Sequence, residues 1–98
     1  MQFRFENSEL ADLYHKETGV AAYPESVVES FFKKMQIIKG VKNENDLRAI
    51  KGNHCEKIKG EENKYSIRLN KGFRLEFGLE KGGECTILLI RDISNHYS

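Results

Sequence analysis

The chain has 98 residues, of which 39% are hydrophobic and 32% charged, and its formal net charge is +1. This length supplies one hydrophobic core, so we expect a single domain over residues 1–98. Because no apolar run approaches the roughly 20 residues that span a bilayer, and no signal-peptide pattern opens the chain, we expect a cytoplasmic protein without a membrane partner.

The N-terminal half predicts one strand and two helices. A short strand is expected over residues 2–6, and Ser8 is placed to cap a helix over residues 9–16. Pro24 suits the first position of a longer helix that Gly40 ends. The apolar residues of that helix fall on one arc of a helical wheel: Val27, Val28, Phe31, Phe32, Met35 and Ile38.

The second half predicts a helical turn over 45–50 and then a run of strands. The strands are expected at about 54–59, 64–70, 73–80 and 84–93, separated by polar breaks that contain glycine. The last strand is apolar on both faces, which is typical of a strand covered on both sides. This order of elements predicts an α+β domain whose helices pack on one face of a sheet.

A hairpin over residues 64–80 carries the most informative pattern. Its core-facing residues alternate with polar ones, and they are Tyr65, Ile67, Leu69, Phe73, Leu75, Phe77 and Leu79. If the apolar residues of both strands face one core, Leu69 pairs with Phe73 across the hairpin. This pairing leaves a three-residue loop, in which Gly72 is expected to adopt a left-handed conformation. The same register places Arg68 opposite Arg74. Like charges facing each other destabilise a sheet, so we predict that an anion, namely a phosphate, binds between them.

The hairpin lies in a basic segment. Residues 57–74 contain Lys57, Lys59, Lys64, Arg68, Lys71 and Arg74 against Glu61 and Glu62. If Ile58 points to the core, Lys57 and Lys59 turn outward and join the two arginines on one open face. A positive patch and an ordinary solvated sheet face explain these charges equally well.

Several short motifs resemble the toxins of the HigB (plasmid maintenance killer) branch of the RelE/ParE superfamily. They are Leu47-x-x-Ile50, Gly52-Asn53, Glu56-Lys57-Ile58-Lys59-Gly60, Tyr65-Ser66-Ile67-Arg68-Leu69-Asn70 and Phe73-Arg74-Leu75-x-Phe77. The resemblance covers residues 47–97. It implies a compact RelE-like domain, with an N-terminal strand and two helices packed on one face of a curved antiparallel sheet.

The activity that the resemblance implies is ribosome-dependent cleavage of mRNA by a metal-independent endoribonuclease, an mRNA interferase that inhibits translation and growth. The implied partners are the ribosome, mRNA and a HigA-like antitoxin with a helix-turn-helix domain, which we expect to cover the basic face. No cofactor is expected. Cys55 and Cys85 lack metal-ligand spacing and are expected to be reduced thiols.

The resemblance assigns catalytic roles to Lys59, Arg68 and Arg74. His96 lies two residues beyond the position of the histidine in the family's terminal Asp-Tyr-His. In RNA cleavage by the 2′-OH, arginines hold the phosphate and His96 or a lysine transfers protons. We expect RNA contacts from three further residues, Lys57, Lys71 and Tyr97, the last by stacking on a base.

Two alternatives remain open at this point. Some members of the superfamily are ParE-like and inhibit DNA gyrase, and an inactive member would only bind an antitoxin. The cation cluster and His96 favour the nuclease. The near-neutral net charge counts against it, because a ribosome binder gains affinity by displacing counterions from phosphates.

Overall fold

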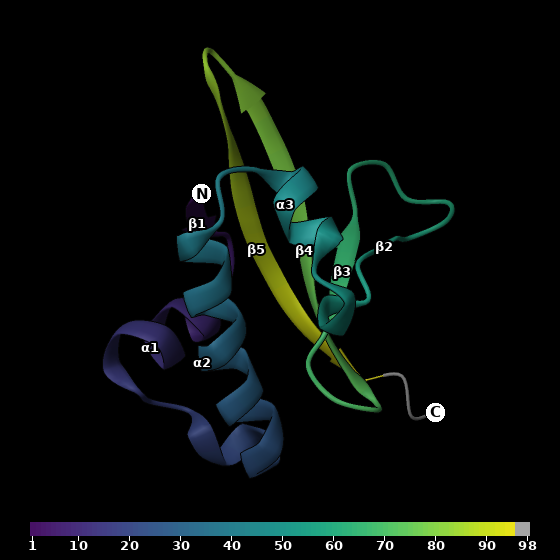
Figure 1. Cartoon of the computed structure of the whole chain (residues 1–98). Coiled ribbons are helices and arrows are strands. Elements are labelled where there is room, and N and C mark those ends of the chain that lie inside the picture. Colours follow the sequence, from purple (N-terminus) through teal and green to yellow (C-terminus); the bar gives the residue numbers. More distant parts are fainter. Residues whose placement is uncertain (96–98) are drawn as a thin grey trace.

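The computed structural model of the chain describes residues 1–95 and has helices on one face of a five-stranded sheet (Figure 1). The elements are β1 (Gln2–Phe5), α1 (Ser8–Lys16), α2 (Glu25–Gly40), α3 (Glu44–Ala49), β2 (Glu56–Lys57), β3 (Tyr65–Arg68), β4 (Phe73–Gly82) and β5 (Cys85–Asn95). Single 3-10 turns lie at Val20–Ala22 and Lys51–Asn53. The predicted α+β class is confirmed. Among the described residues, no helix is long and apolar enough to cross a membrane.

The sheet is mixed, which corrects the expected all-antiparallel arrangement. The strand order is β1-β5-β4-β3-β2. Strands β2 to β5 pair antiparallel, whereas β1 runs parallel to β5 with Phe5 opposite Ile90. Phe3 and Phe5 both pack against the core, so β1 adds a strand to the sheet and also adds to the face of the sheet that is buried.

The core lies between the helices and the sheet. From α1 and α2 it takes Leu10, Leu13, Val27, Phe31, Met35 and Ile38, all at most 1% exposed. Ile67, Leu75, Phe77, Leu88 and Ile90 meet them from the sheet. The predicted arc of α2 is therefore confirmed as its buried side, with Val28 and Phe32 at the margin of the core.

Local signals at three turns differ from expectation. Asn7, not Ser8, caps α1, because its Oδ1 accepts hydrogen bonds from the Glu9 and Leu10 backbone N–H groups at 2.9 and 3.2 Å. Helix α2 ends at Gly40 as predicted, but Pro24 is its N-cap and not its first helical residue. Gly72 is not left-handed, because the side chain of Asn70 closes the hairpin by accepting from the Gly72 and Phe73 N–H groups, both at 3.0 Å.

The hairpin register is confirmed. Arg68 lies opposite Arg74, and the Leu69 N–H donates to the Phe73 carbonyl at 2.9 Å. Strand β4 then continues along β5 as a long curved ribbon, which Figure 1 shows projecting beyond the other strands. A register shift between Glu76 and Phe77 interrupts that ladder.

Charged side chains cover the outer face of β5, the face turned away from the helices. Leu89 on this face is only 5% exposed. Arg4 on β1 lies beside Leu89 of β5. Its side chain crosses β5 and reaches Glu80 on β4, with 3.3 Å between Arg4 Nη2 and Glu80 Oε1. The Arg91 guanidinium bonds Glu6 and the Asn63 carbonyl, each at 2.8 Å. Strand β5 is thus apolar on both faces although helices cover only one.

Gly78 leaves room for the Arg91 guanidinium. A Cβ at Gly78 would lie 2.5 Å from Arg91 Cζ, whereas a Cβ at Gly82 in the same strand would meet nothing within 4 Å. We predict that Gly78→Ala displaces Arg91 from Glu6 and Asn63 and lowers the free energy of unfolding by about 1 to 2 kcal/mol. Gly82→Ala is the matched control and should change it by less than about 0.5 kcal/mol. Urea titrations of both variants check this, and equal losses would contradict it.

Tyr23 should make the fold sensitive to high pH. Burial, followed by the nearby Asp92 and Glu9 carboxylates, raises the pKa of Tyr23 above 10.0. A raised pKa favours the neutral phenol in the folded state, so its contribution is complete below the unfolded pKa and is lost as the pH rises through the folded pKa. Unfolding of the wild type and Tyr23→Phe between pH 8 and 11 should show a shallower alkaline loss in the variant; parallel curves would exclude this role.

Candidate functional site

Arg74 is held in place on the outer face of the sheet. Its side chain is 13% exposed. Nε donates to Ser66 Oγ at 2.7 Å, and Nη2 donates to the His54 carbonyl and, at 3.4 Å, to the Ser66 carbonyl. An arginine has five N–H donors. These bonds use Nε and Nη2, so among the described residues the two N–H groups of Nη1 are the donors that remain.

Arg68 lies directly opposite Arg74 but is not restrained. It is exposed, and within residues 1–95 no ion pair or side-chain hydrogen bond holds it. Because facing residues on antiparallel strands share one face, both guanidiniums lie on the side of the sheet away from the helices. The structure therefore places a fixed cation beside an adjustable one.

The predicted orientation of β2 is wrong. Glu56 pairs with Ser66, and Lys57 pairs with Tyr65. Glu56 therefore shares the face of Arg74, while Lys57 shares the face of Tyr65, which packs against the core. The reason is that β2 has only two residues, both exposed, so no buried face fixes its parity. The four predicted cations do not line one face of the sheet.

The segment after β2 nevertheless lies beside Arg74. An open groove of about 490 Å³ is lined by Glu56, Lys57, Ile58, Lys59, Ser66 and Arg74. Lys59 is exposed and Ile58 is half-buried. Lys57 and Lys59 belong to the segment at the edge of the sheet, and both line the groove although the alternation of β2 does not place Lys57 on the face of Arg74.

Two protein carboxylates already lie among these cations. Glu56 Oε2 lies 3.9 Å from Arg74 Nη2, and Glu76 Oε1 lies 3.3 Å from Lys64 Nζ. The repulsion between Arg68 and Arg74 is therefore partly relieved within the chain. An external anion is not required to explain why the two arginines face each other. Glu56 and Ser66 were not predicted from the sequence as partners of Arg74. The contact of Ser66 with Arg74 could be found from the sequence, because Ser66 lies on the same face of its strand as Arg68 and diagonally opposite Arg74.

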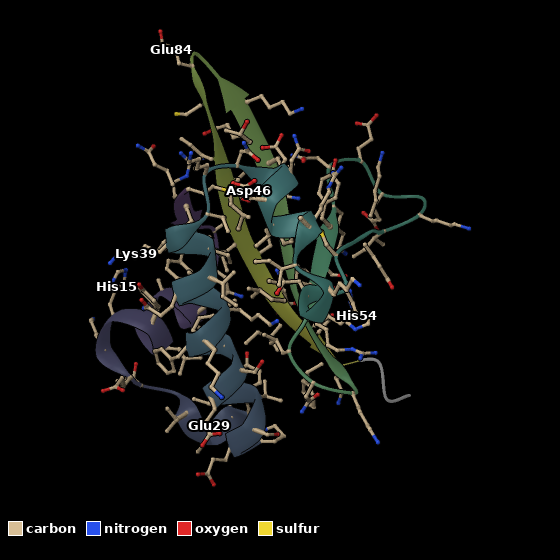
Figure 2. The ribbon with its side chains drawn as sticks, in the orientation of Figure 1. His15, Glu29, Lys39, Asp46, His54 and Glu84 are labelled. Carbon is tan, nitrogen blue, oxygen red and sulfur yellow. The ribbon has the colours of Figure 1, made fainter. Side chains whose placement is uncertain are left out.

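The remaining predicted residues lie apart or outside the described part. Lys71 is exposed in the β3–β4 loop. His96 and Tyr97 lie outside the described residues. Figure 2 shows His54 after the Lys51–Asn53 turn and His15 on the other side of the molecule, and both are exposed.

Cys55 is half-buried and Cys85 exposed, and both are free thiols. Burial raises the pKa of the Cys55 thiol more than the Arg48 guanidinium lowers it, which disfavours a nucleophilic thiolate there. Within residues 1–95, no three side chains of metal-binding type come together.

The two arginines should differ sharply in their effect on stability. Arg74→Ala leaves Ser66 Oγ, which belongs to a residue only 2% exposed, and the His54 carbonyl without their donor. We predict a loss of about 1 to 3 kcal/mol in the free energy of unfolding. Arg68→Ala removes a like-charge contact and should be neutral or stabilising by a few tenths of a kcal/mol. Urea unfolding compares them, and a reversed order would contradict the assignment.

Comparisons with known proteins identify the family of the chain. A family described as RelE-like toxin of type II toxin-antitoxin system HigB matches residues 3–89. Toxin HigB-1 of Vibrio cholerae is 32% identical over 78 residues, covering 79% of this chain and 82% of that protein. An uncharacterized protein of Haemophilus influenzae is 40% identical over 58 residues, covering 58% of this chain and 57% of that protein.

A solved structure shares the fold. A YoeB/ParE toxin from Agrobacterium tumefaciens superposes with a TM-score of 0.62 and 19% identity, covering 99% of this chain and 100% of that chain. The family match spans most of the chain, and the implied partner of a type II toxin is an antitoxin. The chain therefore belongs to the HigB-like toxins of type II toxin-antitoxin systems, a family of which ribosome-dependent RNase activity is typical.

Proposed function

We propose that this toxin cleaves mRNA on the ribosome and that Arg68 and Arg74 hold the scissile phosphate. The observation that carries the proposal is the pairing of a fixed and an unrestrained guanidinium on one open face. Guanidinium groups fork onto two phosphate oxygens. The Nη1 group of Arg74 offers two donors in a set position, and Arg68 closes on the phosphate from the opposite strand.

The chemistry proposed for this site needs no group beyond the RNA and the chain. The 2′-OH attacks the adjacent phosphorus, charge develops on the phosphoryl oxygens, and the 5′-oxygen leaves with a proton. Preorganised donors stabilise such charge most effectively when they are already in place, which is the condition of Arg74. Lys59 and Lys57 line the groove beside Arg74. Together with His96 they are our candidates for proton transfer, while Lys71 and Tyr97 are candidates for RNA contacts.

The proposed partners are those that the family suggests, and the same face supports a place for the antitoxin. The ribosome presents the mRNA in the cytoplasm, and a HigA-like antitoxin with a helix-turn-helix domain neutralises the toxin. We propose that an acidic segment of the antitoxin covers Arg68 and the groove. Arg68 is exposed and unpaired within residues 1–95, and burying it against a carboxylate is the simplest way to block a phosphate.

Arg68→Ala separates catalysis from folding better than Arg74→Ala does, because Arg68 makes no side-chain bond within residues 1–95. Removing an electrostatic stabiliser lowers the rate by roughly a hundred to a thousandfold. We predict that loss in the cleavage of mRNA on purified ribosomes, measured by primer extension. Lys81→Ala is the matched control, because Lys81 is another exposed cation of the β3–β4–β5 ribbon, near the far end of β4, and it should keep full activity.

Three outcomes would overturn the proposal. Equal losses in Arg68→Ala and Lys81→Ala would indicate a general charge effect instead of a phosphate site. Growth arrest with intact messages and inhibited supercoiling would assign the chain to the gyrase inhibitors. No growth arrest at all would leave a protein that only binds its antitoxin.

A further inference from the structure

A buried amide joins the helices to the turn before β2. Asn53 is 0% exposed. Its Oδ1 accepts a hydrogen bond from Lys34 Nζ of α2 at 2.7 Å, and its Nδ2 donates to the Leu47 carbonyl of α3 at 3.0 Å. Lys34 also reaches the Gly52 carbonyl at 3.4 Å. Unpaired polar groups are costly when buried, so these bonds fix the Lys51–Asn53 turn against both helices.

His54, the residue after Asn53, has an unusual backbone conformation. His54 lies in the left-handed region, with φ 44° and ψ 53°, and its N–H donates to the Lys51 carbonyl at 3.2 Å. A residue with a Cβ rarely adopts this conformation unless its surroundings impose it. The buried Asn53 lies directly before His54 in the same turn. The left-handed turn aims the His54 carbonyl at Arg74, from whose Nη2 it accepts a hydrogen bond.

We infer that Lys34 and Asn53 are positioning residues for Arg74. The contacts run from Lys34 to Asn53, through the backbone to the His54 carbonyl, and on to the Arg74 guanidinium. Neither Lys34 nor Asn53 lines the groove, so they act through Arg74 and not on the RNA. The inference rests on the proposed function for its effect on rate, but the contacts themselves do not depend on it.

The placement of Lys34 makes it the better residue to change. Lys34 is half-buried, and burial lowers the pKa of its ammonium group. Lys34→Met keeps the apolar stem and removes the donor to Asn53, whereas substitution of Asn53 itself removes two bonds from a fully buried position and risks the fold. Lys34→Arg restores a cationic donor. Lys33→Met is the matched control, because Lys33 is the exposed neighbour in the same helix.

The experiment is a double-mutant cycle on the cleavage of ribosome-bound mRNA. We expect Lys34→Met to lower the single-turnover rate at saturating ribosomes by roughly ten- to a hundredfold, with little change in the ribosome concentration that gives half the maximal rate. Lys34→Arg should recover part of the rate. In an Arg74→Ala background, Lys34→Met should cause no further loss, because the group that it positions is gone.

A second readout keeps the inference separate from the proposed function. Hydrogen exchange of the Arg74 Nη2 N–H groups, which bond the His54 carbonyl, should accelerate in Lys34→Met and stay unchanged in Lys33→Met when followed by NMR on the isolated toxin. Multiplicative losses of rate in the cycle, or unchanged exchange in Lys34→Met, would overturn the positioning role. A wild-type protein that cleaves no mRNA would overturn the proposed function, while the exchange measurement would still decide the positioning role.

Discussion

Burial of one face of the β3–β4 hairpin is the constraint on which the site depends. Ile67 and Leu75 are both 0% exposed, and they face each other across the two strands. A slip by one residue would turn these side chains to solvent, at roughly 1.5 to 3 kcal/mol for each. The repulsion between Arg68 and Arg74 costs at most about 1 kcal/mol. The hydrophobic term wins, and it holds the two cations face to face.

The surrounding groups turn this forced pairing into an asymmetric one. Ser66, Glu56 and the His54 carbonyl gather round Arg74, whereas Arg68 extends into solvent. A pair of this kind suits phosphate binding in two respects. The fixed member loses little conformational entropy on binding, and the exposed member can follow the substrate as it enters. The Glu56 carboxylate, 3.9 Å from Arg74, also lowers the net charge around the two arginines and so reduces the repulsion between them.

The sequence predicts the elements that bury a long, periodic face and fails where no such face exists. The arc of α2 and the register of β3 with β4 follow from periodicity, and both are confirmed. Strand β2 has two exposed residues, so the side to which Lys57 turns could not be read from alternation. The closing of the hairpin by the Asn70 side chain competes with a left-handed glycine, and both are plausible from sequence alone.

The partners of Arg74 illustrate a second limit. Ser66 could be found from strand parity, but the His54 carbonyl is a backbone group brought in by a 3-10 turn and a left-handed residue. The Gly52-Asn53 motif was visible, yet its role depends on Lys34, which lies in a different helix. Contacts of this kind are set by packing between distant segments, which local propensity and spacing do not encode.

The proposed mechanism requires the scissile phosphate to lie between Arg68 and Arg74. The most direct measurement is a cryo-EM structure of the wild-type toxin on a ribosome whose mRNA carries a 2′-O-methyl group at the cleavage site, which blocks the attacking hydroxyl. We expect a phosphate within hydrogen-bond distance of Arg74 Nη1 and of the Arg68 guanidinium, with Arg74 still bonded to Ser66 and His54. A bound mRNA that passes the other face of the sheet, or a phosphate held without either arginine, would contradict it.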